Sequence, residues 1–173
     1  MTIAVAHSSG LTAEERTSIH RLCHRAYGED LGSLFAAYAD PTHVLGHLGK
    51  ELVSHAMWVT RWLQPDDGPL LRTAYVEMVA TDPHHRNRGF ATGVLRHLAS
   101  RVGDYDLAAL SPGETTLYGR LGWILWRGPL FIRSDGGLIP SPDERIMILS
   151  LPKTPILHVD SPLSAEWRGG ELW

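Results

Sequence analysis

The chain has 173 residues, of which 43% are hydrophobic and 20% are charged, as in an ordinary globular protein of one domain. Its formal net charge of −3 argues against nucleic-acid binding and is compatible with a cationic small-molecule partner. No segment reaches the ~18 apolar residues of a membrane span, and the N-terminus lacks the pattern of a signal peptide. The single cysteine, Cys23, fits a reducing compartment, and the scattered histidines lack the spacing of metal ligands. We therefore expect a cytoplasmic protein without a metal.

The first part of the chain reads as one helix followed by a helical segment and three strands. Thr12 and Glu15 form a capping-box pattern, which predicts a helix that ends near Gly28. A short helix is predicted over 31–38. The strands are predicted over 43–48, 52–63 and 70–81, with a tight hairpin at Gly49-Lys50 between the first two.

A long helix from Phe90 to Val102 is predicted next, followed by short elements. These are a strand over 106–110, a helix from 112–115 that ends at Gly122, strands over 123–126 and 130–133, a loop over 134–142, a strand over 145–151 and a tail over 152–173. The order predicts one α+β domain over residues 1–173, with a mostly antiparallel sheet flanked by helices.

The stretch from Ala74 to Leu98 combines an apolar strand, a basic glycine turn and a helix. Arg86, Arg88, Gly89 and Ala91 follow the pattern R-x-x-G-x-A. Such a turn directs several main-chain N–H groups and the positive end of a helix at one point, which favours a phosphate. The alternative is an ordinary surface turn with two solvated arginines.

The turn resembles the pyrophosphate loop of the GNAT superfamily of acyl-CoA-dependent N-acetyltransferases, whose consensus is [RQ]-x-x-G-x-[GA]. The predicted order of elements agrees with the GNAT fold. The resemblance implies acetyl-CoA as co-substrate and one set of residues that binds it: Val79, Ala80 and Thr81 for pantetheine, and Arg86, Asn87, Arg88, Gly89, Phe90 and Ala91 for the pyrophosphate.

A tyrosine on a short helix is the second feature shared with this superfamily. In the segment Leu117 to Trp123, Tyr118 stands four residues before Gly122. A phenol at that place would protonate the coenzyme A thiolate as it leaves. The alternative is a tyrosine that only packs beneath its helix.

A narrower resemblance is to the aminoglycoside 2′-N-acetyltransferases. It rests on YVEMVA at 75–80, the block at 117–123, Gly128-Pro129, the loop at 142–144 and the terminal WRGGELW. It implies that Glu77 binds the sugar and takes a proton from its amine through water. Members of this family are often dimers, which makes a homodimer one expectation here, although no stretch of the sequence identifies an interface. The other residues that it places at the substrate are Asp30, Met78, Glu144, Glu171 and Trp173, with Ser111 as a weaker candidate.

An acidic pocket of this kind suits a polyamine sugar, and Glu77 stands out because it interrupts an apolar strand. Asp143, by contrast, reads as a solvated surface acid. We expect direct attack of the amine on the thioester, with the Val79 N–H holding the oxyanion. Cys23, on the buried face of the first helix, is a poor nucleophile, so no acyl-enzyme is expected.

Other interpretations remain open at this stage. The chain could acetylate another small polyamine or a peptide amine, or bind acetyl-CoA or a drug without turnover. Among aminoglycosides, kasugamycin is as compatible with the sequence as gentamicin or tobramycin. Three histidines and two tryptophans could shape the substrate pocket or merely fill the faces of the sheet: His43, His47, His55, Trp58 and Trp62.

Overall fold

The computed structural model describes residues 1–169 and 173, which form two compact units. The first unit comprises Met1–Val59 and Val76–Arg101, and the second comprises Thr60–Tyr75 and Val102–Trp173. Each unit is described by itself below, and the expectation of a single domain stays a prediction.

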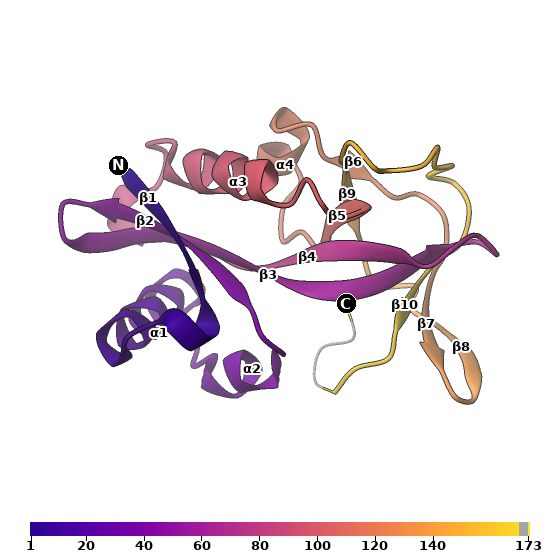
Figure 1. Ribbon diagram of the computed structural model, residues 1–173, viewed down its shortest axis with the longest axis horizontal. Coiled ribbons are helices and arrows are strands. Elements are labelled where there is room, and N and C mark those ends of the chain that lie inside the picture. The colour runs from indigo at the N-terminus through magenta and orange to yellow at the C-terminus, as the bar shows by residue number, and fades with distance from the viewer. Residues whose placement is uncertain (170–172) are drawn as a thin grey trace. The chain divides into compact units, whose positions relative to one another are not determined.

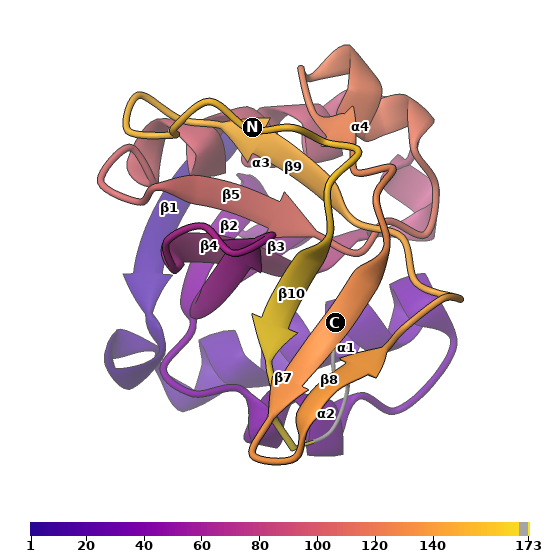
Figure 2. The same ribbon diagram turned by 90° about the vertical axis from the view of Figure 1, so that its right-hand side faces the viewer.

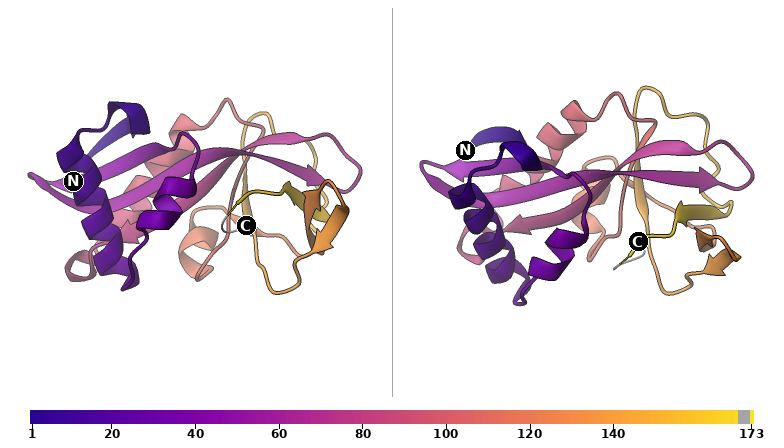
Figure 3. Two further views of the ribbon diagram at one scale, coloured as in Figure 1. Left: turned by 90° about the horizontal axis from the view of Figure 1, so that it is seen from below. Right: turned by 60° about the horizontal axis from the view of Figure 1, so that its bottom comes forward.

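The first unit is a small sheet with helices on both of its faces. β1 pairs with β2 and β2 with β3, both antiparallel. The helices α1 and α2 lie on one face of these strands and α3 on the other (Figures 1 and 3). The elements that begin in this unit are β1 (Thr2–His7), η1 (Ser8–Gly10), α1 (Ala13–Tyr27), α2 (Gly32–Ala37), β2 (Thr42–Leu48), β3 (Glu51–Pro65), η2 (Pro83–His85) and α3 (Phe90–Arg101).

The ends of α1 follow from local sequence. The Thr12 hydroxyl accepts the Glu15 N–H at 3.2 Å, and the Glu15 carboxylate accepts the Thr12 N–H at 2.8 Å, so the predicted capping box is confirmed. Gly28 ends the helix with a φ of 83°, which glycine adopts without strain. Between these ends, Ile19, Leu22 and Cys23 are buried against the sheet.

The second unit continues the two long strands β3 and β4 (Leu71–Thr81). Two pairs of strands are parallel, β4 with β5 and β7 with β10. Four pairs are antiparallel: β5 with β9, β6 with β9, β3 with β10 and β7 with β8 (Figure 2). Its other elements are β5 (Leu107–Leu110), α4 (Thr116–Arg120), β6 (Ile124–Leu125), β7 (Leu130–Ser134), β8 (Gly137–Pro140), β9 (Met147–Ser150) and β10 (Leu163–Glu166). The predicted α+β class with a mostly antiparallel sheet is confirmed.

Three strands were not predicted from the sequence. β1 precedes the first helix, β8 lies within the expected loop at 134–142, and β10 lies within the tail. β8 forms a hairpin with β7 although all four of its residues are exposed. These strands depend on partners elsewhere in the chain, and so local patterns carry little sign of them.

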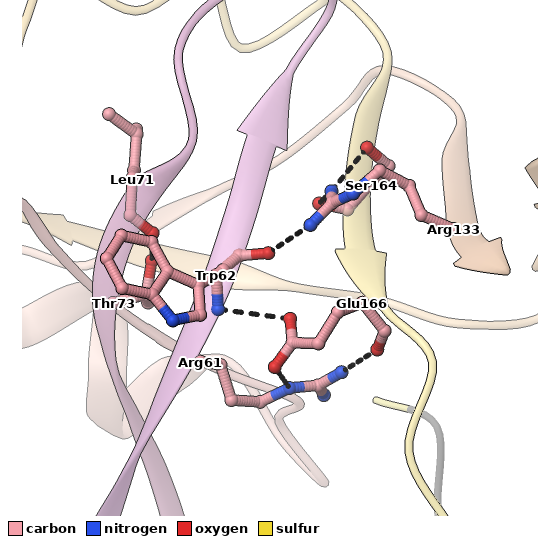
Figure 4. Close-up of polar contacts among 7 residues, drawn as sticks. All are labelled: Arg61, Trp62, Leu71, Thr73, Arg133, Ser164 and Glu166. Atoms are coloured by element: carbon pink, nitrogen blue, oxygen red, sulfur yellow. Dashed lines mark hydrogen bonds and ion pairs between the residues drawn. The ribbon is translucent and has the colours of Figure 1, made fainter. Parts of the chain in front are cut away.

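A polar cluster fastens β10 to β3 and β7 (Figure 4). Arg61, 1% exposed, donates to the main-chain oxygen of Glu166 at 2.8 Å. The Glu166 carboxylate in turn accepts the Trp62 N–H at 3.0 Å. Arg133 donates to the Ser164 carbonyl at 2.7 Å and to its hydroxyl at 2.8 Å.

Across the described residues, no helix has the length and apolar character to cross a membrane.

Candidate active site

The turn between β4 and α3 has the backbone of an anion-binding loop. Asn87 and Gly89 have φ values of 60° and 78°, in the left-handed region. A side chain at Gly89 would meet no atom within 4 Å but would be strained at this φ. α3 begins at the next residue, Phe90, so its first N–H groups point back toward the turn.

The main-chain N–H groups of this turn are available to a ligand. Within residues 1–169 and 173, those of residues 86–91 donate no hydrogen bond to another protein atom. The N–H of the preceding residue, His85, does have a partner, the Asp82 carbonyl at 2.8 Å. Unsatisfied amides beside a helix N-terminus fit the diphosphate of acetyl-CoA.

Both arginines of the turn are exposed, and each has a protein partner. Arg86 donates to the Ala26 carbonyl at 2.9 Å. Arg88 lies 2.8 Å from the His85 ring and 5.1 Å from the centre of the Phe90 ring. These contacts hold both arginine side chains in place, and their remaining N–H groups can still bind an anion.

The last turn of α1 braces β4 and the loop together. Arg25 contacts one Asp82 carboxylate oxygen through Nε at 2.8 Å and through Nη2 at 2.7 Å. Burial alone would raise the pKa of the Asp82 carboxyl, but the His84 N–H and the Arg25 guanidinium outweigh it and lower that pKa. Tyr27, two residues after Arg25, donates its hydroxyl to the Val79 carbonyl at 2.9 Å.

β4 contains a local distortion at the candidate thioester position. Met78 has a φ of 52°, a left-handed conformation inside a strand that is typical of a β-bulge. Three successive carbonyls from this point accept side-chain hydrogen bonds: Met78 from His55 at 2.9 Å, Val79 from Tyr27 at 2.9 Å and Ala80 from Ser54 at 3.1 Å. The Ser54 hydroxyl also lies 2.9 Å from the Thr81 hydroxyl. Glu77, the residue before Met78, is half-buried.

Tyr118 lies on α4 in the second unit. It is 8% exposed. The centre of its ring lies 6.1 Å from the centre of the Trp123 ring, and the two rings meet edge to face. The Glu114 carboxylate accepts the N–H groups of Thr116 and Leu117 at 2.7 and 3.1 Å, which fixes the start of the helix. Burial, followed by the nearby Glu114 charge, raises the pKa of Tyr118 to about 12. The phenol therefore keeps its proton at neutral pH.

The remaining candidates fall in different places. Asp30 is exposed and accepts the Gly32 N–H at 2.9 Å at the start of α2. Ser111 and Glu144 are exposed, and Trp173 is 3% exposed. Glu171 lies outside the described residues. Glu77 and the loop belong to the first unit and Tyr118 to the second, so their cooperation stays a prediction.

Sequence reasoning missed four residues that hold the site's backbone, namely Arg25, Tyr27, Ser54 and Asp82, and it named His55 only as a residue of the pocket or of the sheet faces. Only Asp82 carries a local signal, since an aspartate before Pro83 is typical of a helix start. The view of Cys23 as a poor nucleophile agrees with its environment, because burial raises the pKa of its thiol to about 12.

The α+β fold, with its strand, glycine turn and helix from β4 to α3, agrees with the class of protein that the sequence resembles, the acyl-CoA-dependent transferases. A sequence model described as an acetyltransferase (GNAT) domain matches residues 9–125. An aminoglycoside 2′-N-acetyltransferase from Mycolicibacterium fortuitum is 32% identical over 186 aligned residues, which cover 99% of this chain and 92% of that protein. The chain therefore belongs to the GNAT acetyltransferase family, and it uses acetyl-CoA.

Further relatives and structures agree with this assignment. N-acetyltransferase Eis from Mycobacterium tuberculosis is 35% identical over 77 residues, 43% of this chain but 19% of that protein. YhbS from Escherichia coli, solved in complex with CoA, has a TM-score of 0.64 at 14% identity, over 96% of this chain and 89% of its own. Eis1 from Mycobacterium abscessus has a TM-score of 0.62 at 19% identity, over 71% of this chain and 31% of its own. At these identities the solved structures show the fold alone.

Proposed function

We propose that this acetyltransferase transfers the acetyl group of acetyl-CoA to the 2′-amine of an aminoglycoside, and so confers resistance to that antibiotic. The observation that carries the proposal is the 32% identity to an aminoglycoside 2′-N-acetyltransferase over nearly the whole of both chains. The substrate would be of the kasugamycin type or of the gentamicin and tobramycin type.

The acidic residues support a cationic substrate. Asp30 and Glu144 are exposed and Glu77 is half-buried, so all three can meet a solvated ligand. One exposed pair contributes only ~0–1 kcal/mol, but several carboxylates around one polycation attract it together. Met78, Ser111, Glu171 and Trp173 are proposed to complete the substrate pocket.

The reaction is direct attack by the amine nitrogen on the thioester carbonyl. Residues 86–91 hold the diphosphate, residues 79–81 hold the pantetheine arm, and the Val79 N–H stabilises the oxyanion. Glu77 removes the proton from the 2′-ammonium through a water molecule. As the carbon–sulfur bond breaks, Tyr118 gives its proton to the departing thiolate, and the proton that the acylated nitrogen releases in forming the amide restores the Tyr118 phenol. Tyr118 is protonated at neutral pH, as this role requires, since burial and the Glu114 charge raise its pKa to about 12.

The second candidate is acetylation of another small polyamine or of a peptide amine. It is favoured by the similarity to N-acetyltransferase Eis and to YhbS, whose names do not specify an aminoglycoside. Non-catalytic binding of acetyl-CoA or a drug is a third possibility, against which the buried, protonated Tyr118 argues.

One assay separates these candidates. The protein is incubated with acetyl-CoA and, in turn, kasugamycin, gentamicin, tobramycin, spermidine and a peptide with a free N-terminus. We expect release of free thiol with at least one aminoglycoside, and NMR of the product should place the acetyl group on the 2′-nitrogen. Thiol release with spermidine or the peptide alone would instead support the second candidate, and no release with any amine would support a binding module.

A further inference from the structure

A chain of hydrogen bonds crosses the first unit from its surface to the distorted strand. Ser8 Oγ lies 2.8 Å from His43 Nε2, His43 Nδ1 lies 2.9 Å from His55 Nε2, and His55 Nδ1 lies 2.9 Å from the Met78 carbonyl. The four residues come from η1, β2, β3 and β4. His43 is 3% exposed and His55 is fully buried, so the inner part of this hydrogen-bond chain has no access to solvent.

The carbonyl at the inner end fixes the direction of every bond. A carbonyl only accepts, so His55 must carry its proton on Nδ1 and accept on Nε2. His43 must then donate from Nδ1 and accept on Nε2, where the Ser8 hydroxyl donates. Both rings are neutral in this arrangement, in agreement with burial, which lowers the pKa of His43 to about 4 and that of His55 to about 3.

This hydrogen-bond chain holds the Met78 carbonyl in place and does not conduct protons. Its last member is a main-chain carbonyl, which cannot pass a proton to Glu77 or to any other acid or base. What it can do is satisfy the oxygen of a buried residue in a strained conformation. Met78 is 8% exposed with a φ of 52°, and without the His55 N–H its carbonyl would lose that partner.

We propose that Ser8, His43 and His55 are positioning residues for acetyl transfer, which hold Met78 in its left-handed conformation and thereby set the directions of Glu77 and of the Val79 N–H. This inference rests on the proposed function of those two groups. It gives His43 and His55 a role beyond filling the faces of the sheet.

The outer end of this hydrogen-bond chain, at Ser8, predicts that the effects of substitutions on kcat form a gradient. Ser8 and His43 line a cavity of about 480 Å³, large enough for water molecules. In Ser8→Ala a water can donate to His43 Nε2 in place of the hydroxyl. In His43→Leu no donor reaches His55 Nε2, and in His55→Leu the Met78 carbonyl itself loses its bond. The effects on kcat should therefore increase from Ser8 to His43 to His55.

The test compares leucine and asparagine variants at both histidines. Asparagine can place an N–H near the position of Nδ1, whereas leucine cannot. We expect His55→Leu to lower kcat about tenfold or more while the Kd for coenzyme A, measured by calorimetry, changes less than about twofold. His55→Asn should recover most of the loss. Ile132→Ala, a fully buried change on β7 in the second unit, is the control for lost stability and should leave kcat per folded molecule unchanged.

A second readout does not depend on activity. Long-range proton–nitrogen NMR of the wild-type imidazoles should show the Nδ1–H tautomer for both His43 and His55 at pH 7, and the amide resonances of Glu77 and Val79 should shift in His43→Leu. An Nε2–H tautomer in either ring would overturn the proposal, as would equal losses of kcat in His55→Leu and Ile132→Ala. If the wild-type protein acetylates no amine, the proposed function fails, while the tautomers and amide shifts still decide the positioning of Met78.

Discussion

The phenol of Tyr118 illustrates how burial keeps a single residue protonated. An ordinary tyrosine is half ionised near pH 10, and the phenolate form cannot protonate a thiolate. Burial and the nearby Glu114 raise the pKa of Tyr118 to about 12. The residue therefore remains protonated at neutral pH and still at pH 10.

Replacing Tyr118 with phenylalanine tests its role as proton donor. The variant keeps the ring that packs on Trp123 but has no proton to give. We expect kcat to fall about 10²-fold, with the KM for acetyl-CoA changed less than about twofold. Steady-state assays of thiol release would measure both constants.

The pH profile gives an internal check on the same role. In the wild-type protein, kcat should show no tyrosine-dependent fall near pH 10, because the pKa of Tyr118 is about 12. An unchanged kcat in Tyr118→Phe, or an alkaline limb near pH 10 that the variant lacks, would contradict the prediction.

At the scale of elements, the end of α1 sets the shape of the cofactor loop. Arg25, Ala26 and Tyr27 each contact a different point of the segment from Val79 to Arg86. A helix is stiff over such a short distance, so three contacts from one turn hold the strand end and the loop in a fixed relation. The loop amides can then stay unpaired without collapsing onto the protein.

Asp82→Asn tests this brace. The change keeps the size of the side chain but removes the charge that Arg25 contacts at 2.7 Å in a site where Asp82 is 3% exposed. We expect a loss of about 1–3 kcal/mol in the free energy of unfolding and a several-fold higher KM for acetyl-CoA. Urea unfolding and steady-state kinetics would measure these effects.

The chain offers a matched control for that change. Arg127 and Asp160 form an ion pair with two contacts of 2.6 Å, but both side chains are largely exposed. Asp160→Asn should therefore have little effect on stability and none on the KM for acetyl-CoA. Equal effects of the two substitutions would show that the position of Asp82 under the loop has no importance.

The histidine pair between β2 and β3 predicts how stability depends on pH. His43 has a pKa lowered from the ordinary 6.5 to about 4, and that of His55 is lowered to about 3, chiefly by burial. In each case the unfolded chain binds a proton more readily than the folded protein does. This stability is therefore complete above pH 6.5 and is lost as the pH falls from 6.5 toward 4.

Urea unfolding at pH 7 and pH 5 measures this loss. The charged and titratable neighbours His7, Arg16 and His20 also disfavour protonation of His43, so they add to the effect. We expect a lower free energy of unfolding at pH 5 in the wild type, and a smaller difference between the two pH values in a variant with asparagine at both histidines. The same free energy at both pH values in the wild type would show that the pair does not remain neutral in the folded state.

At the scale of the whole molecule, two long strands belong to both compact units. β3 spans Glu51–Pro65 and β4 spans Leu71–Thr81, and the units divide each strand between them. A strand cannot lose its pairing along one half without disturbing the backbone of the other half. The units should for this reason unfold together, as one domain.

Native-state hydrogen exchange tests this prediction. The slowest amides of β2 in the first unit and of β5 in the second should exchange with the same free energy of opening, equal to that of global unfolding. Two clearly different opening free energies would divide the chain into independent domains and contradict the prediction.

The sequence by itself determined the features that neighbouring residues specify. The capping box at Thr12 and Glu15, the end of α1 at Gly28 and the turn at residues 86–91 each depend on a few consecutive residues, and each has the predicted structure. The resemblance to GNAT proteins rests on such local motifs, and the family match confirms it.

Only the tertiary structure decided which distant groups meet. β1, β8 and β10 are strands because of the partners they find, and β10 depends on Arg61, which is 105 residues away from Glu166. The donors to the Met78 and Val79 carbonyls come from β3 and α1, 23 and 52 residues away along the chain. A hydrogen bond depends on distance in space and not on separation in sequence, so no local pattern could identify the side chains that contact the backbone at Met78 and Val79.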